Sequence, residues 1–208
     1  PDLLTTRTSR LLLWSLFLKG DFSRAAQLSG EVLARSAPNT LEQAFGLALT
    51  GILAGIDEDY GRCGELCTAA HDLVKIAAAD PDPVTAIFTQ VGMAVTASGQ
   101  DDYAQLRRHV TPALAQAQTM RSPAFTLLCL PLLAIQLAHE AEPEQAVRLL
   151  SLAFNHPAHT STWLEKWPLL TRLQQELAAE LEEGQYAELW AAGRALDLKT
   201  VEDWLPAG

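Results

Sequence analysis

Three side chains with metal-binding chemistry, Cys63, Cys67 and His71, follow one another at intervals of four residues. Thiolate and imidazole groups bind zinc, and a helix would place all three on one face. With a rise of 1.5 Å per residue, however, Cys63 and His71 are about 12 Å apart along the axis, too far for one ion. Two of them could bind with help from another helix. We expect a buried stripe instead, because free cysteine behaves as a small apolar residue.

A second pair of metal-binding side chains, His156 and His159, lies in a loop around a proline. Acids and cysteines are sparse there, so we interpret these imidazoles as hydrogen-bonding to backbone carbonyls. Acidic turns at 57–59, 80–82 and 101–102 lack the alternating spacing of a calcium loop, and we predict that they cap helices. No nucleophile has a motif around it. We therefore predict no catalytic residue, no metal and no cofactor.

Four of the five tryptophans, Trp167 among them, lie in the last quarter of the chain. We expect these rings to form one core that seals the end of the molecule, rather than a ligand cage. Arg194 could pair with Glu188 or Glu202 and so hold the last helices together, or it could contact a neighbouring domain. The predicted residues of a structural cap or an interdomain contact are Trp163, Trp190, Gly193, Arg194 and Trp204.

The elements that position these residues are organised by a turn that recurs about every 40 residues. An acidic residue precedes Phe22, Tyr60 and Tyr103, and Pro143 takes the aromatic place in the fourth copy. Each turn separates two stretches with the apolar spacing of a helix. The pattern predicts an α-solenoid of antiparallel hairpins, because one such unit cannot bury its apolar face alone.

Helix start and stop signals divide the chain into two regions. The first eight helices are expected at 3–18, 22–35, 41–56, 60–79, 83–98, 102–120, 123–139 and 143–154, as four hairpins within residues 1–155. The following helices are expected at 162–183, 186–196 and 200–204, as a helical cap over 156–208 that is continuous with the repeats. Pro112 is expected to kink or split its helix near His109, and Pro131 to kink the next one.

Composition limits the classes of function. The net charge of −10 argues against direct nucleic-acid contact, because DNA-binding surfaces are basic. Three cysteines, an odd number, predict no disulfide framework, which is typical of proteins in the reducing cytoplasm. No uninterrupted apolar run reaches the length of about 18 residues that a membrane span needs. No secretory signal is recognisable. The first residue, Pro1, suggests a piece of a longer protein.

The turn Gly20-Asp21-Phe22, followed by Ala25, resembles the start of the second helix in tetratricopeptide-like repeats, although the period here is longer than their usual length of about 34 residues. The last third resembles the end of the repeat region in large bacterial transcriptional regulators. These include the LuxR/MalT-type signal-transduction ATPases and activators with a winged helix and a bacterial activation domain. The matching residues are Trp190, Gly193, Arg194, Leu196 and Leu198, with Val201 in place of the usual alanine.

The resemblance implies a non-catalytic regulatory module, which binds a protein or a small-molecule effector and acts on attached domains in signal transduction. No P-loop and no basic recognition helix occurs in this sequence, so the ATPase or DNA-binding parts would lie outside it. The alternative is a stand-alone tetratricopeptide-type adaptor that binds a peptide of a partner protein. A third class, an enzyme with its active site in a helical bundle, lacks a recognisable group of catalytic residues.

Overall fold

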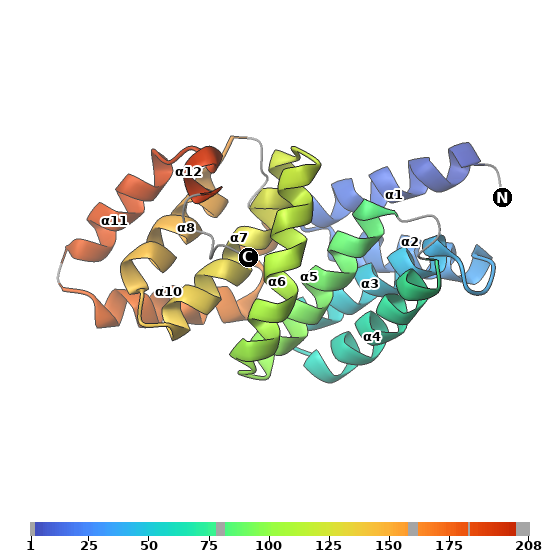
Figure 1. Cartoon of the computed structure of the whole chain (residues 1–208), viewed down its shortest axis with the longest axis horizontal. Coiled ribbons are helices and arrows are strands. Elements are labelled where there is room, and N and C mark those ends of the chain that lie inside the picture. The colour runs from blue at the N-terminus through green and yellow to red at the C-terminus, as the bar shows by residue number, and fades with distance from the viewer. Residues whose placement is uncertain (1–2, 78–81, 158–161, 183, 203–208) are drawn as a thin grey trace.

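A computed structural model of the chain describes residues 3–77, 82–157, 162–182 and 184–202. These residues form helices joined by turns, with no strand among them, which confirms the all-α class (Figure 1). The helices are α1 (Leu3–Leu18), α2 (Phe22–Arg35), α3 (Leu41–Ile56), α4 (Tyr60–Ile76), α5 (Pro83–Gly99), α6 (Tyr103–Thr119), α7 (Pro123–His139), α8 (Pro143–Asn155), α9 (Thr162–Glu165), α10 (Pro168–Glu180), α11 (Gln185–Arg194) and α12 (Leu198–Glu202).

The helix boundaries agree closely with the sequence signals, apart from a break at Pro168. The helix expected at 162–183 is broken, because Pro168 starts a new helix and disfavours helical backbone in the residue before it. The sequence predicts a kink or a split at Pro112; the helix is not split, since α6 runs through this residue, which lies on the exposed side. Water can satisfy the carbonyl that proline leaves free there. Helix α7 likewise continues through Pro131.

The turns that recur in the sequence share one backbone geometry. In each, the second residue after the first helix has a left-handed backbone, and the residue after it donates its N–H to a carbonyl five positions earlier. Asp59 donates in this way to Ala54 at 2.9 Å, which is the Schellman arrangement. The left-handed residues are Gly20 (φ 67°), Glu58 (φ 65°), Asp101 (φ 55°) and Ala141 (φ 60°).

Most of the acidic turn residues cap the helix that follows. The carboxylates of Asp59 and Asp102 each accept a backbone N–H at 3.1 Å, from Arg62 and Gln105. Asp82 accepts the N–H of Val84 at 3.2 Å. The prediction that these acids cap helices is therefore confirmed at those turns. Glu142 is the exception, with no capping bond from its side chain.

Neighbouring helices in the chain are neighbours in space. The order along the long axis of Figure 1 follows the sequence, from α3 and α4 through α5, α6 and α7 to α8 and α11. Helices α3, α5 and α7 also contact one another in turn, which makes them an inner layer. Helix α1 lies across this layer. The ring centroid of its Trp14 lies 5.3 Å from that of Phe88 of α5 and 5.6 Å from that of Phe125 of α7.

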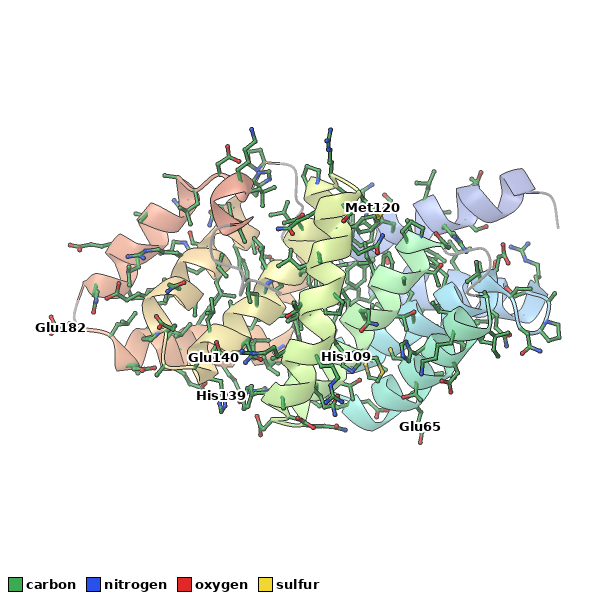
Figure 2. All side chains as sticks on the ribbon, in the orientation of Figure 1. Glu65, His109, Met120, His139, Glu140 and Glu182 are labelled. Carbon is green, nitrogen blue, oxygen red and sulfur yellow. The ribbon has the colours of Figure 1, made fainter. Side chains whose placement is uncertain are left out.

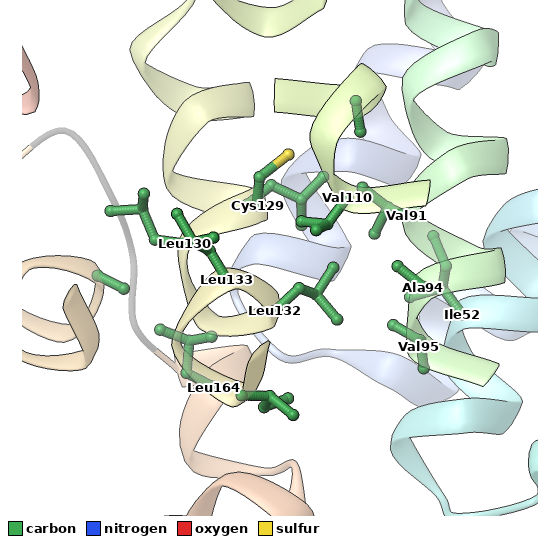
Figure 3. Close-up of a cluster of buried hydrophobic side chains, with 14 of the residues drawn as sticks. Ile52, Val91, Ala94, Val95, Val110, Cys129, Leu130, Leu132, Leu133 and Leu164 are labelled. Carbon is green, nitrogen blue, oxygen red and sulfur yellow. The ribbon is translucent and has the colours of Figure 1, made fainter. Parts of the chain in front are cut away.

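The core runs continuously through the inner layer. Figure 3 shows Ile52 of α3 beside Val91 and Val95 of α5, and these face Leu132 of α7. Leu164 of the short helix α9 belongs to the same cluster and is fully buried. The segment after residue 161 therefore shares the core of the earlier helices.

That late segment turns back along the molecule. Trp163 packs 5.1 Å from Phe17 of α1, and Lys166 donates to the carbonyl of Gly20 at 2.6 Å. Arg172 then pairs with Glu58 at 2.5 Å. Helices α9 and α10 thus contact the first and second recurring turns, whereas α11 packs on α8. The sequence predicts an end cap over 156–208; among the described residues, α9 and α10 instead cross the turns.

Candidate functional site

A cavity of about 420 Å³ lies between α10, two of the recurring turns and the end of α7. This volume falls within the range of about 300–1,000 Å³ that is usual for small-molecule sites. Its first wall comes from the ends of α5 and α7 and the starts of α4 and α6, and α10 forms the other wall. Figure 2 shows His139, at the lower end of α7, on the first wall. The polar and aromatic lining residues are Tyr60, Ser98, Asp101, Tyr103, His139, Arg172, Glu176 and Glu180.

The tyrosines of the recurring turns form the aromatic part of the cavity wall. Tyr103 stacks on His139 at the end of α7, with ring centroids 3.7 Å apart and planes 7° apart. Tyr60 lies against Gly99, where a Cβ atom would overlap the phenol ring. Each aromatic side chain therefore packs on the end of the first helix in the next hairpin. The close approach at Gly99 explains why a residue without a side chain stands there.

The charged residues of the cavity come from α10 and the turns. Arg172 of α10 is paired with Glu58, so its charge is balanced. Glu176 and Glu180 lie further along the same helix, and within the described part of the chain neither forms an ion pair or a hydrogen bond. Asp101 accepts the hydroxyl of Tyr103 at 3.1 Å. The cavity thus carries an excess of negative charge at the end near Tyr103.

Both tyrosine hydroxyls are held in their neutral form. Burial is the main cause that raises the pKa of Tyr103, and the hydrogen bond and charge of Asp101 and the charge of Glu176 add to it. Burial and the nearby Glu58 likewise raise the pKa of Tyr60, against an opposing effect of Trp167 and Arg172. These hydroxyls can therefore donate hydrogen bonds across a wide range of pH.

Nucleophilic groups on the cavity wall are already engaged. The hydroxyl of Ser98 is buried and donates to the carbonyl of Val95 at 2.8 Å. His139 packs face to face on Tyr103. The arrangement can hold a polar molecule by hydrogen bonds and charge. The sequence analysis named Tyr60 and Tyr103 as turn residues and missed their place in a site, although their recurrence at equivalent turns was the available signal.

The predicted tryptophan core is divided in the structure. Trp163 and Trp167 are buried, with ring centroids 6.5 Å apart. Trp163 packs on Phe17 of α1, and Trp167 lies beside Tyr60 of α4. Trp190 packs between α8 and α11 instead, with its ring centroid 5.8 Å from those of both Phe154 and Tyr186. Trp204 lies outside the described residues. The physical reason is the return path of α9 and α10, which carries the first two rings away from α11.

Gly193 has a role in packing that follows from its missing side chain. A Cβ atom there would lie 2.5 Å from the backbone oxygen of Arg148 and 2.6 Å from the Cβ of Ser151. The Ser151 hydroxyl also donates to the carbonyl of Trp190 at 2.5 Å. These contacts hold α11 tightly on α8. Arg194 is exposed and forms no ion pair with Glu188, and the side chain of Glu202 lies outside the described part.

The cysteines behave as packing residues. Cys63 and Cys67 are fully buried on α4, and their thiols are directed at the carbonyls of Gly92 and Ala48. His71 is only partly buried and lies near His109 of α6. Among the described residues, no group of three or more His, Cys, Asp or Glu side chains could hold a metal ion. His156 caps α8 through its backbone N–H, whereas His159 lies outside the described residues.

Comparison with known proteins assigns no relative: the sequence matches no protein-family model, no curated protein and no solved structure. The resemblance to the repeat regions of bacterial regulators therefore stays a prediction. Within the described residues, no helix has the length and apolar character to cross a membrane.

Proposed function

We propose that this chain is a non-catalytic regulatory module that binds a small polar ligand and passes the effect to attached domains. The observation that carries this proposal is the cavity, because two successive turns, the end of α7 and α10 meet around it. A molecule bound there would contact each of these turns at once. Binding energy could thus be used to favour one relative placement of the helical hairpins over another.

The proposed body is an α-solenoid in which α1 to α8 form four antiparallel hairpins of the tetratricopeptide-like type. The shared turn geometry and the contacts of α3, α5 and α7 support this description. A solenoid changes its curvature through small rotations between adjacent repeats. The tyrosines of the turns lie at such junctions, so a ligand beside Tyr60 and Tyr103 would act where the hairpins meet.

The proposed context is a bacterial transcriptional regulator, in the cytoplasm, and it rests on the sequence phrase around Trp190, Gly193 and Arg194. The close packing of Gly193 on α8 gives part of that phrase a physical reason. The engaged states of Ser98 and His139 support a binding role rather than a catalytic one. The negative net charge favours attached domains, rather than this segment, as the part that meets nucleic acid.

The alternative function, a peptide-binding adaptor, is less favoured by the same geometry. A peptide would need the inner surface formed by α3, α5 and α7. Helix α1 covers part of that surface through Trp14, and α9 covers another part through Leu164 (Figure 3). Burial of one large apolar side chain contributes about 1.5–3 kcal/mol, so a peptide is a weak competitor for these fixed helices.

The proposal can be tested with a metabolite library and thermal unfolding, because a ligand of the native state raises the melting temperature. The cavity is narrowed by Ala138→Phe, whereas Ala115→Phe adds the same ring on the exposed side of α6. We expect a small molecule that stabilises the parent protein and the Ala115→Phe variant but not the Ala138→Phe variant. Equal responses of the two variants, or no stabilising compound, would contradict the proposal.

A further inference from the structure

The lining of the cavity is polarised along α10. Arg172, Glu176 and Glu180 are spaced by four residues and face the cavity, so each step along the helix axis is about 6 Å. Arg172 turns to Glu58 instead of pairing with Glu176. The two glutamates are consequently left without a cationic partner within the described residues.

The opposite wall adds negative charge at the same end. Asp101 and Tyr103 belong to the turn before α6, and the charge of Glu176 acts on the Tyr103 hydroxyl from across the cavity. Carboxylates from two separate elements therefore converge on one space that also has a phenol ring beside it. An ammonium group is the natural counterpart, because it can bind several carboxylate oxygens and also lie against an aromatic ring.

The other end of the cavity offers donors. Tyr60 and Arg172 line this end, and their hydroxyl and guanidinium groups carry O–H and N–H donors. Trp167 is fully buried behind them, beside the Tyr60 hydroxyl, and is not part of the lining. A ligand atom that accepts a hydrogen bond would meet Tyr60 and Arg172 at this end.

We propose that the cavity binds a small organic amine, with its ammonium group between Asp101, Glu176 and Glu180 and its carbon chain between Tyr60 and Tyr103. An acceptor group on the same molecule would reach the end formed by Tyr60 and Arg172. This inference rests on the proposed function of the cavity. A compact metal ion does not fit, since no group of acids in the described residues is close enough to bind one.

The test uses calorimetric titration of the whole chain with three molecules that share a four-carbon chain: putrescine, 1,4-butanediol and succinate. We expect binding in the order putrescine, then butanediol, then succinate, with the affinity for putrescine falling as salt is added. Lysine tests the acceptor end: its carboxylate should make it bind more tightly than its decarboxylated form, cadaverine.

A variant pair locates the site. The double variant Glu176→Gln, Glu180→Gln should weaken putrescine binding by about tenfold, since exposed charge pairs contribute modestly. Glu65→Gln, which removes an exposed acid from α4, should leave the affinity unchanged. Circular dichroism and melting temperature confirm that each variant is folded.

Two outcomes overturn the inference, and they differ from failure of the proposed function. Butanediol or succinate binding as well as putrescine, or a double variant that binds putrescine like the parent, shows that the cavity does not select amines. If a library compound nevertheless stabilises the parent protein but not the Ala138→Phe variant, the cavity still serves as a ligand site. If no library compound depends on the cavity, the proposed function fails as well.

Discussion

At the scale of single residues, glycine makes room for two thiols in the core. A Cβ atom at Gly51 would lie 2.6 Å from the Sγ of Cys67, and one at Gly92 would be closer still. Cys63 and Cys67 therefore fill a space between α3, α4 and α5 that only residues without side chains leave open. This explains their burial without any need for a metal.

Replacing Gly92 by alanine should destabilise the protein by about 1–3 kcal/mol, because the new methyl group overpacks the core. In a Cys67→Ala background the same change should cost clearly less, since the sulfur that it meets is gone. Urea unfolding of the parent, the two single variants and the double variant measures the coupling between Gly92 and Cys67. Gly30→Ala is the control, because nothing lies within 4 Å of a Cβ atom there; it should be neutral or stabilising. Equal costs in both backgrounds would refute the contact.

Two partly buried histidines should make stability depend on pH. Burial is the main cause that lowers the pKa of His71 and of His109 below the ordinary value of 6.5. Lys75 also lowers the pKa of His71, against an opposing effect of Asp72; for His109, His71 and Arg108 lower it. The unfolded chain then takes up protons at a higher pH than the folded chain does. Stability is present above the unfolded pKa and is lost as the pH falls toward the lowered folded values.

Urea unfolding between about pH 7.5 and pH 5.5 should therefore show a decrease in stability of at most about 1 kcal/mol, because both rings are partly exposed and solvent screens them. The double variant His71→Gln, His109→Gln should lose most of this decrease. The His109 ring also lies 2.7 Å from the side-chain oxygen of Gln90, and glutamine preserves a donor there. If the free energy of unfolding of the double variant falls with pH as steeply as that of the parent, other groups cause the effect.

At the scale of elements, the recurring turn combines three local signals. A left-handed residue follows the first helix in all four copies, and an aspartate caps the next helix in the first three. At Tyr60 and Tyr103, the aromatic residue that starts this helix packs on the end of a later helix. Glycine takes the left-handed position only in the first copy, at Gly20. Glu58, Asp101 and Ala141 adopt this backbone without the freedom of glycine, which costs roughly 1–2 kcal/mol for a residue with a Cβ atom.

Ala141→Gly should raise the free energy of unfolding by about 0.5–1 kcal/mol, because glycine adopts a left-handed backbone without strain. Thermal or urea unfolding measures the change. Ala115→Gly is a control on the exposed face in the interior of α6, where glycine should cost about 1 kcal/mol. A loss of stability at both positions would show that the turn at Ala141 is not strained.

At the scale of the whole molecule, α9 and α10 tie early turns to late helices. Lys166 reaches the carbonyl of Gly20, and Arg172 reaches Glu58. Trp163 and Trp167 bury large rings against the first half of the chain. Contacts between such distant parts of a chain make its unfolding more cooperative than that of an open repeat array, in which each unit touches only its neighbours.

Removal of residues 160–208 should therefore give an aggregating product, because it uncovers the apolar surface around Phe17 and Leu132. Trp163→Ala should cost about 3–5 kcal/mol, the usual loss for a buried tryptophan. Trp190→Ala should cost less and lower the melting temperature by several degrees, since Trp190 is only half-buried. Calorimetry and size-exclusion chromatography measure these effects. A truncated chain that is monomeric and melts near the intact protein would contradict this picture.

Local signals in the sequence were sufficient for the all-α class and most helix boundaries. Proline, glycine and capping acids act within a few residues of their position, so their effects can be predicted without tertiary structure. The recurring turn was also evident, because Phe22, Tyr60 and Tyr103 repeat at similar intervals. The burial of Cys63 and Cys67 followed from the spacing of a helical face.

Tertiary structure alone decided the path of α9 and α10, and with it the cavity. Nothing local in the sequence tells that Arg172 meets Glu58, because the two are separated by 114 positions. The partners of Trp163 and Trp190 depend in the same way on where each helix lies, and apolar burial has no preferred direction. The candidate site arises where the returning helix meets the turns, so its residues could be recognised only once their distances were known.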